Sequence, residues 1–293
     1  LNDPSFATEF GRFNLEVNTA PRRLEGDCLS QTEAELRTKL ARVSAAAHGL
    51  NGEVVLTGIL PTLRKSDLTL DNISPKQRYH ALNEAMTELG REDFEFRLRG
   101  ADELIVKHDS VMLESCCTSF QVHYQADPDT LVNLYNTAQA ITAPLLACAV
   151  NSPLLFGRRL WMETRIPLFQ QGLDTRSASA SMRERASRVS FGRQWMQRSA
   201  VELFQEDIAR FRVLLGSKID EEPMVVLRQG GIPKLRALQI HNGTIYRWNR
   251  ACYGVTDGLP HLRIENRVLP AGPTVLDEVA NGAFFWGLMR GLP

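Results

Sequence analysis

Apolar and polar residues alternate along several stretches of this chain, and the clearest alternation lies near its C-terminal end. In residues 261–269 the apolar positions alternate with Arg263, Glu265 and Arg267. A period of two residues places successive side chains on opposite faces of a β-strand. The stretch therefore predicts a strand with one apolar face and one polar face that carries all three charged residues.

This polar face has two interpretations. Arg, Glu and Arg on a solvated strand can form an ordinary ladder of cross-strand charge pairs. The same face can instead line a site where Glu265 holds a metal ion and Arg267 holds an oxyanion. Pro270 and Pro273 end the strand, and Thr274 then resembles the first residue of a capping box that opens an amphipathic helix. This sharply defined end of the strand favours the second interpretation, a binding site on the polar face.

Two further strands repeat the same alternation. Residues 10–18 predict a strand with Glu16 on its polar face, and residues 118–125 predict a central strand with His123 on its polar face. Taken alone, Glu16 can be a solvated carboxylate and His123 a hydrogen-bonding group. If the polar faces belong to one sheet, however, Glu16, His123 and Glu265 meet in one cleft.

Helical and strand patterns fill most of the remaining chain. Capping residues and apolar spacing predict helices over residues 30–48, from Ser74, from Asp127 to Asn151, over 195–215 and from Thr274. Further strands are expected over residues 53–60 and 94–98, with a short strand or turn at 111–113. Residues 237–248 predict a hairpin that turns at Asn242-Gly243.

An arginine-rich region lies between the central helix and the last third of the chain. Arg158, Arg159 and Arg165 fall close together, and residues 174–198 are rich in Ser, Ala and Arg. Both a phosphate-binding lid and a solvated loop fit this composition.

Composition restricts the class of protein. The 293 residues are 43% hydrophobic and 23% charged, as in globular proteins, and 34 basic residues balance 34 acidic ones. A net charge of zero gives no general attraction to nucleic acid or to an anionic membrane, so neither is an expected partner. The 5 Cys residues are odd in number and lack zinc-site spacing, which favours a reducing cytoplasm. No apolar run approaches the roughly 18 residues of a membrane span.

The order of these motifs resembles glutamate-cysteine ligase family 2, the carboxylate-amine ligases. In chain order, the resembling pieces are Asn14-Leu-Glu-Val-Asn18, Gln121-Val-His-Tyr124, Ser152-Pro153 with Gly157 and Arg165, Arg250, and Arg263-Ile-Glu-Asn-Arg267. The resemblance implies an α+β fold related to the catalytic domain of glutamine synthetase. In that fold a curved antiparallel sheet has a concave polar face for the active site, and helices pack on the opposite face.

The resemblance also implies a reaction. ATP phosphorylates the carboxylate of one substrate, and an amine then attacks the acyl phosphate to form an amide. Glutamate with cysteine or another small amine would be the substrates, as in γ-glutamylcysteine synthesis.

The same comparison implies roles for individual residues. Mg²⁺ would be held by Glu16 and Glu265, with His123 as a further ligand or a neighbour that orients phosphate. Arg165, Arg250 and Arg267 would be catalytic, holding the glutamate carboxylate or the transferred phosphoryl group. Arg263 would join His123 in binding the nucleotide.

Two departures from the family pattern limit these expectations. Gln121 stands where the family often has the first His of a His-Val-His-Val strand. The family's first strand, which carries a Glu-x-Glu pair of metal ligands, lies upstream of Leu1. We therefore expect residues 1–293 to form a single catalytic domain that lacks its N-terminal strand, is inactive alone and self-associates.

Alternatives from other classes stay open. One is a catalytically silent relative that binds a nucleotide or an amino acid in a regulatory role. Another is a metal-dependent hydrolase, a hypothesis that is supported only by the predicted cluster of carboxylates and His.

Overall fold

The computed structural model describes residues 3–90, 94–108, 110–174 and 187–292. Helices and strands are mixed along these ranges, which confirms the α+β class. Residues 175–186 of the arginine-rich stretch lie outside the described ranges, so the choice between a lid and a loop stays open there. No helix in the described ranges is long and apolar enough to cross a membrane.

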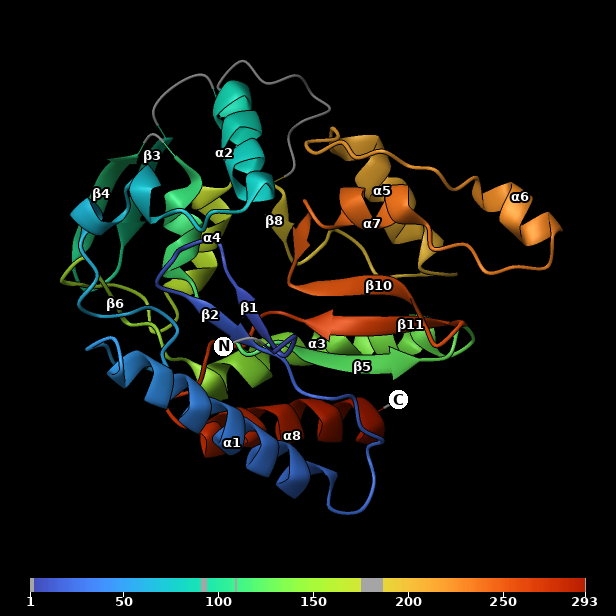
Figure 1. Ribbon diagram of the computed structural model, residues 1–293, viewed down its shortest axis with the longest axis horizontal. Coiled ribbons are helices and arrows are strands. Elements are labelled where there is room, and N and C mark those ends of the chain that lie inside the picture. The colour runs from blue at the N-terminus through green and yellow to red at the C-terminus, as the bar shows by residue number, and fades with distance from the viewer. Residues whose placement is uncertain (1–2, 91–93, 109, 175–186, 293) are drawn as a thin grey trace.

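An antiparallel sheet of three strands lies at the centre of the structure (Figure 1). Its strands are β10 (Asn249–Thr256), β11 (Leu259–Asn266) and β5 (Val122–Ala126), in the order β10-β11-β5. The strand predicted at residues 261–269 is therefore confirmed up to Asn266, where β11 ends before Arg267, and the predicted strand over 118–125 is present in a shorter form. Asp257 and Gly258 join β10 to β11 with φ of 52° and 76°. These positive values suit the two-residue turn that Asp-Gly favours.

Helix α3 (Leu131–Ala149) covers one face of this sheet and leaves the other face free for polar groups (Figure 1). The hydroxyl of Tyr135 on α3 donates to the carbonyl of Asn249 at 3.1 Å, and the Asn249 side chain donates to the Thr142 hydroxyl at 2.8 Å. Ile264 on β11 is fully buried against the core. Because side chains alternate, the neighbours of these residues on each strand face away from α3.

Two long helices extend the helical layer on the α3 side of the sheet. Helix α8 (Val275–Gly291) contacts both α3 and α1 (Cys28–His48), as Figure 1 shows. The Thr274 hydroxyl accepts the backbone N–H of Asp277 at 3.2 Å, which confirms the predicted helix start. This arrangement agrees with the expectation that helices lie on the side opposite the polar face.

The other strands in the described ranges form small separate sheets. The antiparallel pairs are β1 (Phe6–Thr8) with β2 (Leu15–Val17), β3 (Phe94–Arg99) with β4 (Glu103–His108), and β6 (Leu154–Leu155) with β7 (Arg158–Arg159). A parallel pair joins β8 (Val189–Ser190) to β9 (Tyr246–Arg247). The remaining helices are η1 (Lys65–Asp67), η2 (Leu70–Asn72), α2 (Gln77–Gly90), η3 (Val111–Cys116), α4 (Arg165–Gly172), α5 (Val201–Arg210), α6 (Pro223–Arg228) and α7 (Arg236–Asn242).

Three sequence predictions are wrong. The strand predicted over residues 10–18 pairs with β1 and not with β5 or β11, so the polar faces do not form one sheet. Residues 53–60 form a loop, in which Gly58 donates to the Asn151 carbonyl at 3.1 Å. The predicted hairpin over 237–248 is helical at its start. Gly243 has a right-handed φ of −66° and its N–H bonds the Gln239 carbonyl at 2.9 Å, so Asn242-Gly243 ends α7.

Candidate active site

Three strands place Arg250, Glu265 and His123 side by side. In the register of the sheet, Arg250 on β10 lies opposite Glu265 on β11, and Glu265 lies opposite His123 on β5. All three side chains project from the face that α3 does not cover. The predicted meeting of His123 and Glu265 is thus present in the structure, whereas Glu16, the third residue of that prediction, lies on β2 in another sheet.

Glu265 is held between two arginines. Its Oε2 accepts a hydrogen bond from Nε of Arg250 at 2.8 Å and forms an ion pair with Nη2 of Arg250 at 2.7 Å, and its Oε1 accepts a hydrogen bond from Nη1 of Arg267 at 2.7 Å. Burial alone would raise the pKa of Glu265, but the charges of Arg267 and Arg250 outweigh burial and hold that pKa well below its usual range. Glu265 is therefore ionised, and it fixes both guanidinium groups.

His123 and Arg263 form the second polar contact of this face. Nε of Arg263 donates to Nδ1 of His123 at 3.2 Å. Burial lowers the pKa of His123, and the nearby arginine charges lower it further despite the opposing effect of Glu265. A neutral ring whose Nδ1 accepts a hydrogen bond carries its proton on Nε2. His123 therefore orients Arg263 and keeps one N–H donor.

The predicted Mg²⁺ ligands do not form a metal centre. Mg²⁺ prefers several oxygen ligands in near-octahedral geometry. Each oxygen of Glu265 already accepts from an arginine, and Nδ1 of His123 accepts from Arg263. Over the ranges that the structure describes, no group of three or more His, Cys, Asp or Glu is arranged to hold a metal ion. Glu16, His123 and Glu265 thus do not fit the ion as placed here.

Glu16 belongs to a different group of carboxylates. Burial raises the pKa of Glu9 to about 7, and a hydrogen bond that the protonated carboxyl of Glu9 donates to Glu16 adds to the rise. Burial likewise raises the pKa of Glu114 to about 7, although the charge of Arg267 acts against the rise. The effect of Arg267 on Glu114 shows that these carboxylates border the arginine cluster. The sequence analysis missed Glu9 and Glu114 because neither lies in an alternating segment.

Arg165 is buried beside the backbone that follows β11. It is 1% exposed, and its Nη2 and Nη1 donate to the carbonyls of Val268 and Leu269 at 2.8 and 3.3 Å. Its Nε donates to Glu163 at 3.1 Å. These bonds fix the backbone just after Arg267, so the structure gives Arg165 a supporting position and does not group it with Arg250 and Arg267.

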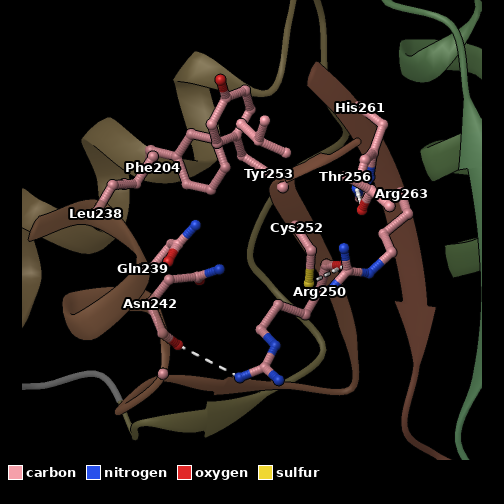
Figure 2. A pocket seen from close by; sticks show the side chains of 13 residues that line it. Phe204, Leu238, Gln239, Asn242, Arg250, Cys252, Tyr253, Thr256, His261 and Arg263 are labelled. Carbon is pink, nitrogen blue, oxygen red and sulfur yellow. Dashed lines mark hydrogen bonds between the residues drawn. The ribbon is translucent and has the colours of Figure 1, made fainter. Parts of the chain in front are cut away.

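A pocket of about 390 Å³ opens beside the arginine cluster (Figure 2). It lies between the polar face of β10 and β11 and the helices α5 and α7. Its lining comprises Phe204, Leu238, Gln239, Asn242, Gly243, Arg250, Cys252, Tyr253, Gly254, Val255, Thr256, His261 and Arg263. Such a volume suits a small-molecule ligand.

The pocket includes residues that the sequence analysis did not select. Cys252 is buried, and its Sγ lies 3.3 Å from Oε2 of Glu265. Cys252 lies two residues after Arg250 on β10 and therefore on the same face of that strand. The sequence analysis missed this alternation because it placed the hairpin turn at Asn242-Gly243 and not at Asp257-Gly258. No local sequence pattern identifies Phe204 or Gln239 as pocket residues, because they lie on helices α5 and α7 and reach the pocket only through the tertiary fold.

Comparison with known proteins gives a match at the level of the family. The model of glutamate-cysteine ligase family 2 matches residues 1–292. No curated protein and no solved structure matches the chain. The matched range contains the complete polar face and the pocket, and it confirms the resemblance that the motifs indicated.

Proposed function

This chain belongs to glutamate-cysteine ligase family 2, and from that premise we propose that it joins a carboxylate to an amine at the expense of ATP. The observation that supports this function best is the row of Arg250, Glu265 and Arg267 beside a small-molecule pocket. We propose glutamate as the carboxylate substrate and cysteine or another small amine as its partner, giving a γ-glutamyl amide.

The proposed reaction has two steps. A carboxylate oxygen of the acid attacks the γ-phosphorus of ATP, and ADP leaves with the electrons of the broken P–O bond. The amine nitrogen then attacks the carbonyl carbon of the acyl phosphate, the C–O bond to phosphate breaks, and the nitrogen loses a proton. Negative charge develops on the transferred phosphoryl group and later on the carbonyl oxygen, and fixed cations stabilise both.

The arginines of the polar face suit this task. Each guanidinium has five N–H donors, of which Glu265 accepts only some from Arg250 and Arg267. Glu265 holds the two groups in place, so little reorganisation is needed when charge develops. We propose that Arg250 and Arg267 hold the reacting carboxylate and phosphoryl oxygens, while Arg165 supports the backbone that follows Arg267.

Several finer properties belong to the same proposal. We infer a catalytic sheet like that of glutamine synthetase, supported by a polar sheet face opposite α3. ATP would enter as its complex with Mg²⁺, to which we assign no protein ligand. Five free cysteines, Cys252 among them, are consistent with a reducing cytoplasm.

An assay of coupled products tests the proposal. The complete protein, with any segment that precedes Leu1, is incubated with ATP, Mg²⁺, glutamate and a panel of amines, and both ADP and amide are measured. We expect the two products in equal amounts and a strong decrease in Arg267→Lys. The matched control is Arg97→Lys, because Arg97 lies exposed in a surface pair with Glu103. ADP release that never depends on the acid would refute the ligase function.

A silent nucleotide- or amino-acid-binding relative is the second candidate. It is favoured by the engagement of both Glu265 oxygens with arginines, which leaves the predicted metal ligands unassembled. If calorimetry detects binding of ATP or glutamate and no product forms over a long incubation, the protein is a binding relative and not a ligase.

A further inference from the structure

We propose that the pocket beside Arg263 binds the amine substrate, and that this substrate is an α-amino acid with an apolar side chain larger than that of cysteine. This inference rests on the proposed ligase function and specifies its second substrate. The resemblance to the family assigned Arg263 to the nucleotide. The pocket instead assigns Arg263 to the carboxylate of the amino acid.

The charge of the lining favours an anion. Arg250 and Arg263 line the pocket, and no Asp, Glu or Lys does so. Glu265 pairs with Arg250 and Arg267, whereas Arg263 has no carboxylate partner in the described ranges. Glu221 lies near the pocket residue Tyr253, but its oxygens accept the backbone N–H groups of residues 234 and 235. Arg263 is therefore the cation best placed to bind a substrate carboxylate.

The guanidinium of Arg263 is held in a defined place. Its Nε is fixed by His123 on the neighbouring strand. Its Nη1 extends across β10, where a Cβ added to Gly254 would lie 3.0 Å from it. The lack of a side chain at Gly254 thus leaves room for the guanidinium on the pocket side of the sheet.

The same lining favours the reactive form of the amine. An ammonium group placed near two guanidinium groups, with no free carboxylate, is electrostatically unfavourable, so the neutral amine is preferred. The side-chain N–H groups of Gln239 and Asn242 donate to the carbonyls of Lys234 and Ala251. Their side-chain oxygens therefore remain as acceptors for the N–H groups of a neutral amine. Only this form carries the lone pair that attacks an acyl phosphate.

The remaining wall of the pocket is apolar. Phe204 on α5, Leu238 on α7 and Val255 on β10 contribute hydrocarbon surface, as does the ring of Tyr253 (Figure 2). The hydroxyl of Tyr253 donates to the Pro233 carbonyl at 2.7 Å and is already satisfied. A volume of about 390 Å³ lies in the range of about 300–1,000 Å³ that holds small-molecule ligands. The apolar wall favours a side chain with more hydrocarbon surface than that of cysteine.

Competition among nucleophiles tests this inference. With ATP, Mg²⁺ and glutamate present, the amines compared are leucine, cysteine, isoamylamine and hydroxylamine. Isoamylamine is leucine without its carboxylate, and hydroxylamine traps the acyl phosphate without filling the pocket. We expect kcat/KM for leucine to exceed that for isoamylamine by about tenfold or more, as one lost hydrogen-bonded charge contact implies. We expect it to exceed that for cysteine by about tenfold, through the additional apolar surface that leucine buries.

Variants connect the preference to Arg263. In Arg263→Gln the ratio of leucine to hydroxylamine activity should fall at least about tenfold. Gln239→Glu should also lower it, because it adds a carboxylate to the pocket lining that disfavours the carboxylate of leucine. Arg97→Gln is the surface control and should keep the ratio. Circular dichroism verifies that each variant is folded. If Arg263→Gln does not fold, the test is made with Gln239→Glu.

The outcomes separate the two proposals. Hydroxamate formation with equal use of leucine, cysteine and isoamylamine would overturn the pocket assignment and leave the ligase function standing. An unchanged leucine-to-hydroxylamine ratio in both folded variants would do the same. No hydroxamate and no ADP from the wild-type protein would overturn the ligase function itself.

Discussion

Replacing Glu265 with Gln should destabilise the protein strongly. The glutamate side chain is 5% exposed, and it neutralises Arg250 and Arg267, whose side chains are 16% and 17% exposed. Gln keeps the volume but removes the charge, and its amide N–H₂ faces guanidinium donors. Both arginines then remain buried without a counter-ion.

The magnitude follows from the two lost charge-assisted pairs. Removing one partner of a buried ion pair costs about 3–5 kcal/mol. The partial exposure of both arginines allows water to relieve some of this cost, so we expect a loss of about 3 kcal/mol in the free energy of unfolding. With a urea m value of about 3 kcal/mol/M, the unfolding midpoint should fall by about 1 M.

The pH dependence supplies a second signature of the same interaction. The folded-state pKa of Glu265 lies below its ordinary value of 4.5, so its ionised form stabilises the fold above that value. This contribution is lost as the pH falls through the lower folded-state pKa. The difference between wild type and Glu265→Gln should therefore be full at pH 7 and shrink below about pH 4.

Urea unfolding followed by circular dichroism measures these effects, with Glu103→Gln as the matched control. Glu103 also pairs with an arginine, but its side chain is 45% exposed and that of Arg97 is 65% exposed, so little change is expected. If Glu265→Gln were as stable as Glu103→Gln at pH 7, the two arginines would not depend on this carboxylate, and the account of a fixed arginine cluster would fail.

Three further substitutions test other parts of the structure. Arg267→Lys should reduce ligase turnover by about 100-fold or more, since a point charge does not replace a bidentate fork; near-normal turnover would place Arg267 outside the reacting centre. Burial raises the pKa of Glu278 to about 7, so its ionisation destabilises the fold as pH rises from 4.5 to 7. Glu278→Gln should therefore be more stable than wild type by up to about 3 kcal/mol in urea unfolding at pH 8 and equal to it at pH 4, and a constant difference would contradict this pKa. Arg165→Lys should lower the free energy of unfolding by about 2–4 kcal/mol through lost bonds to Val268 and Leu269, whereas a loss of turnover at unchanged stability would restore a catalytic role.

The central part of the site could be predicted from the sequence. Period-two alternation fixes which side chains of β11 share a face, so Arg263 and Glu265 were correctly placed together. Arg267 follows the last residue of β11 and still contacts Glu265. The same pattern put His123 on a polar face, and the sheet register then brought it opposite Glu265. The face on which each side chain lies depends on local backbone geometry, which the sequence pattern reports directly.

Other features depend on contacts between distant segments, which periodicity does not encode. Glu16 does lie on a strand, but that strand pairs with β1 and not with the central sheet. Arg165 shares its residue type with Arg250, and only its burial against the carbonyls of Val268 and Leu269 shows its supporting position. The pocket needs Phe204 and Leu238 from two helices that no strand pattern connects to β10.

The formation of γ-glutamyl hydroxamate tests the central claim most directly. The complete wild-type protein, with any segment that precedes Leu1, is mixed with ATP, Mg²⁺, glutamate and hydroxylamine, and hydroxamate and ADP are measured in the same samples. The ligase function predicts equal amounts of both products, no ADP above background without glutamate, and a loss of both in Arg267→Lys. ADP release that is unaffected by glutamate, or the absence of both products, would contradict it.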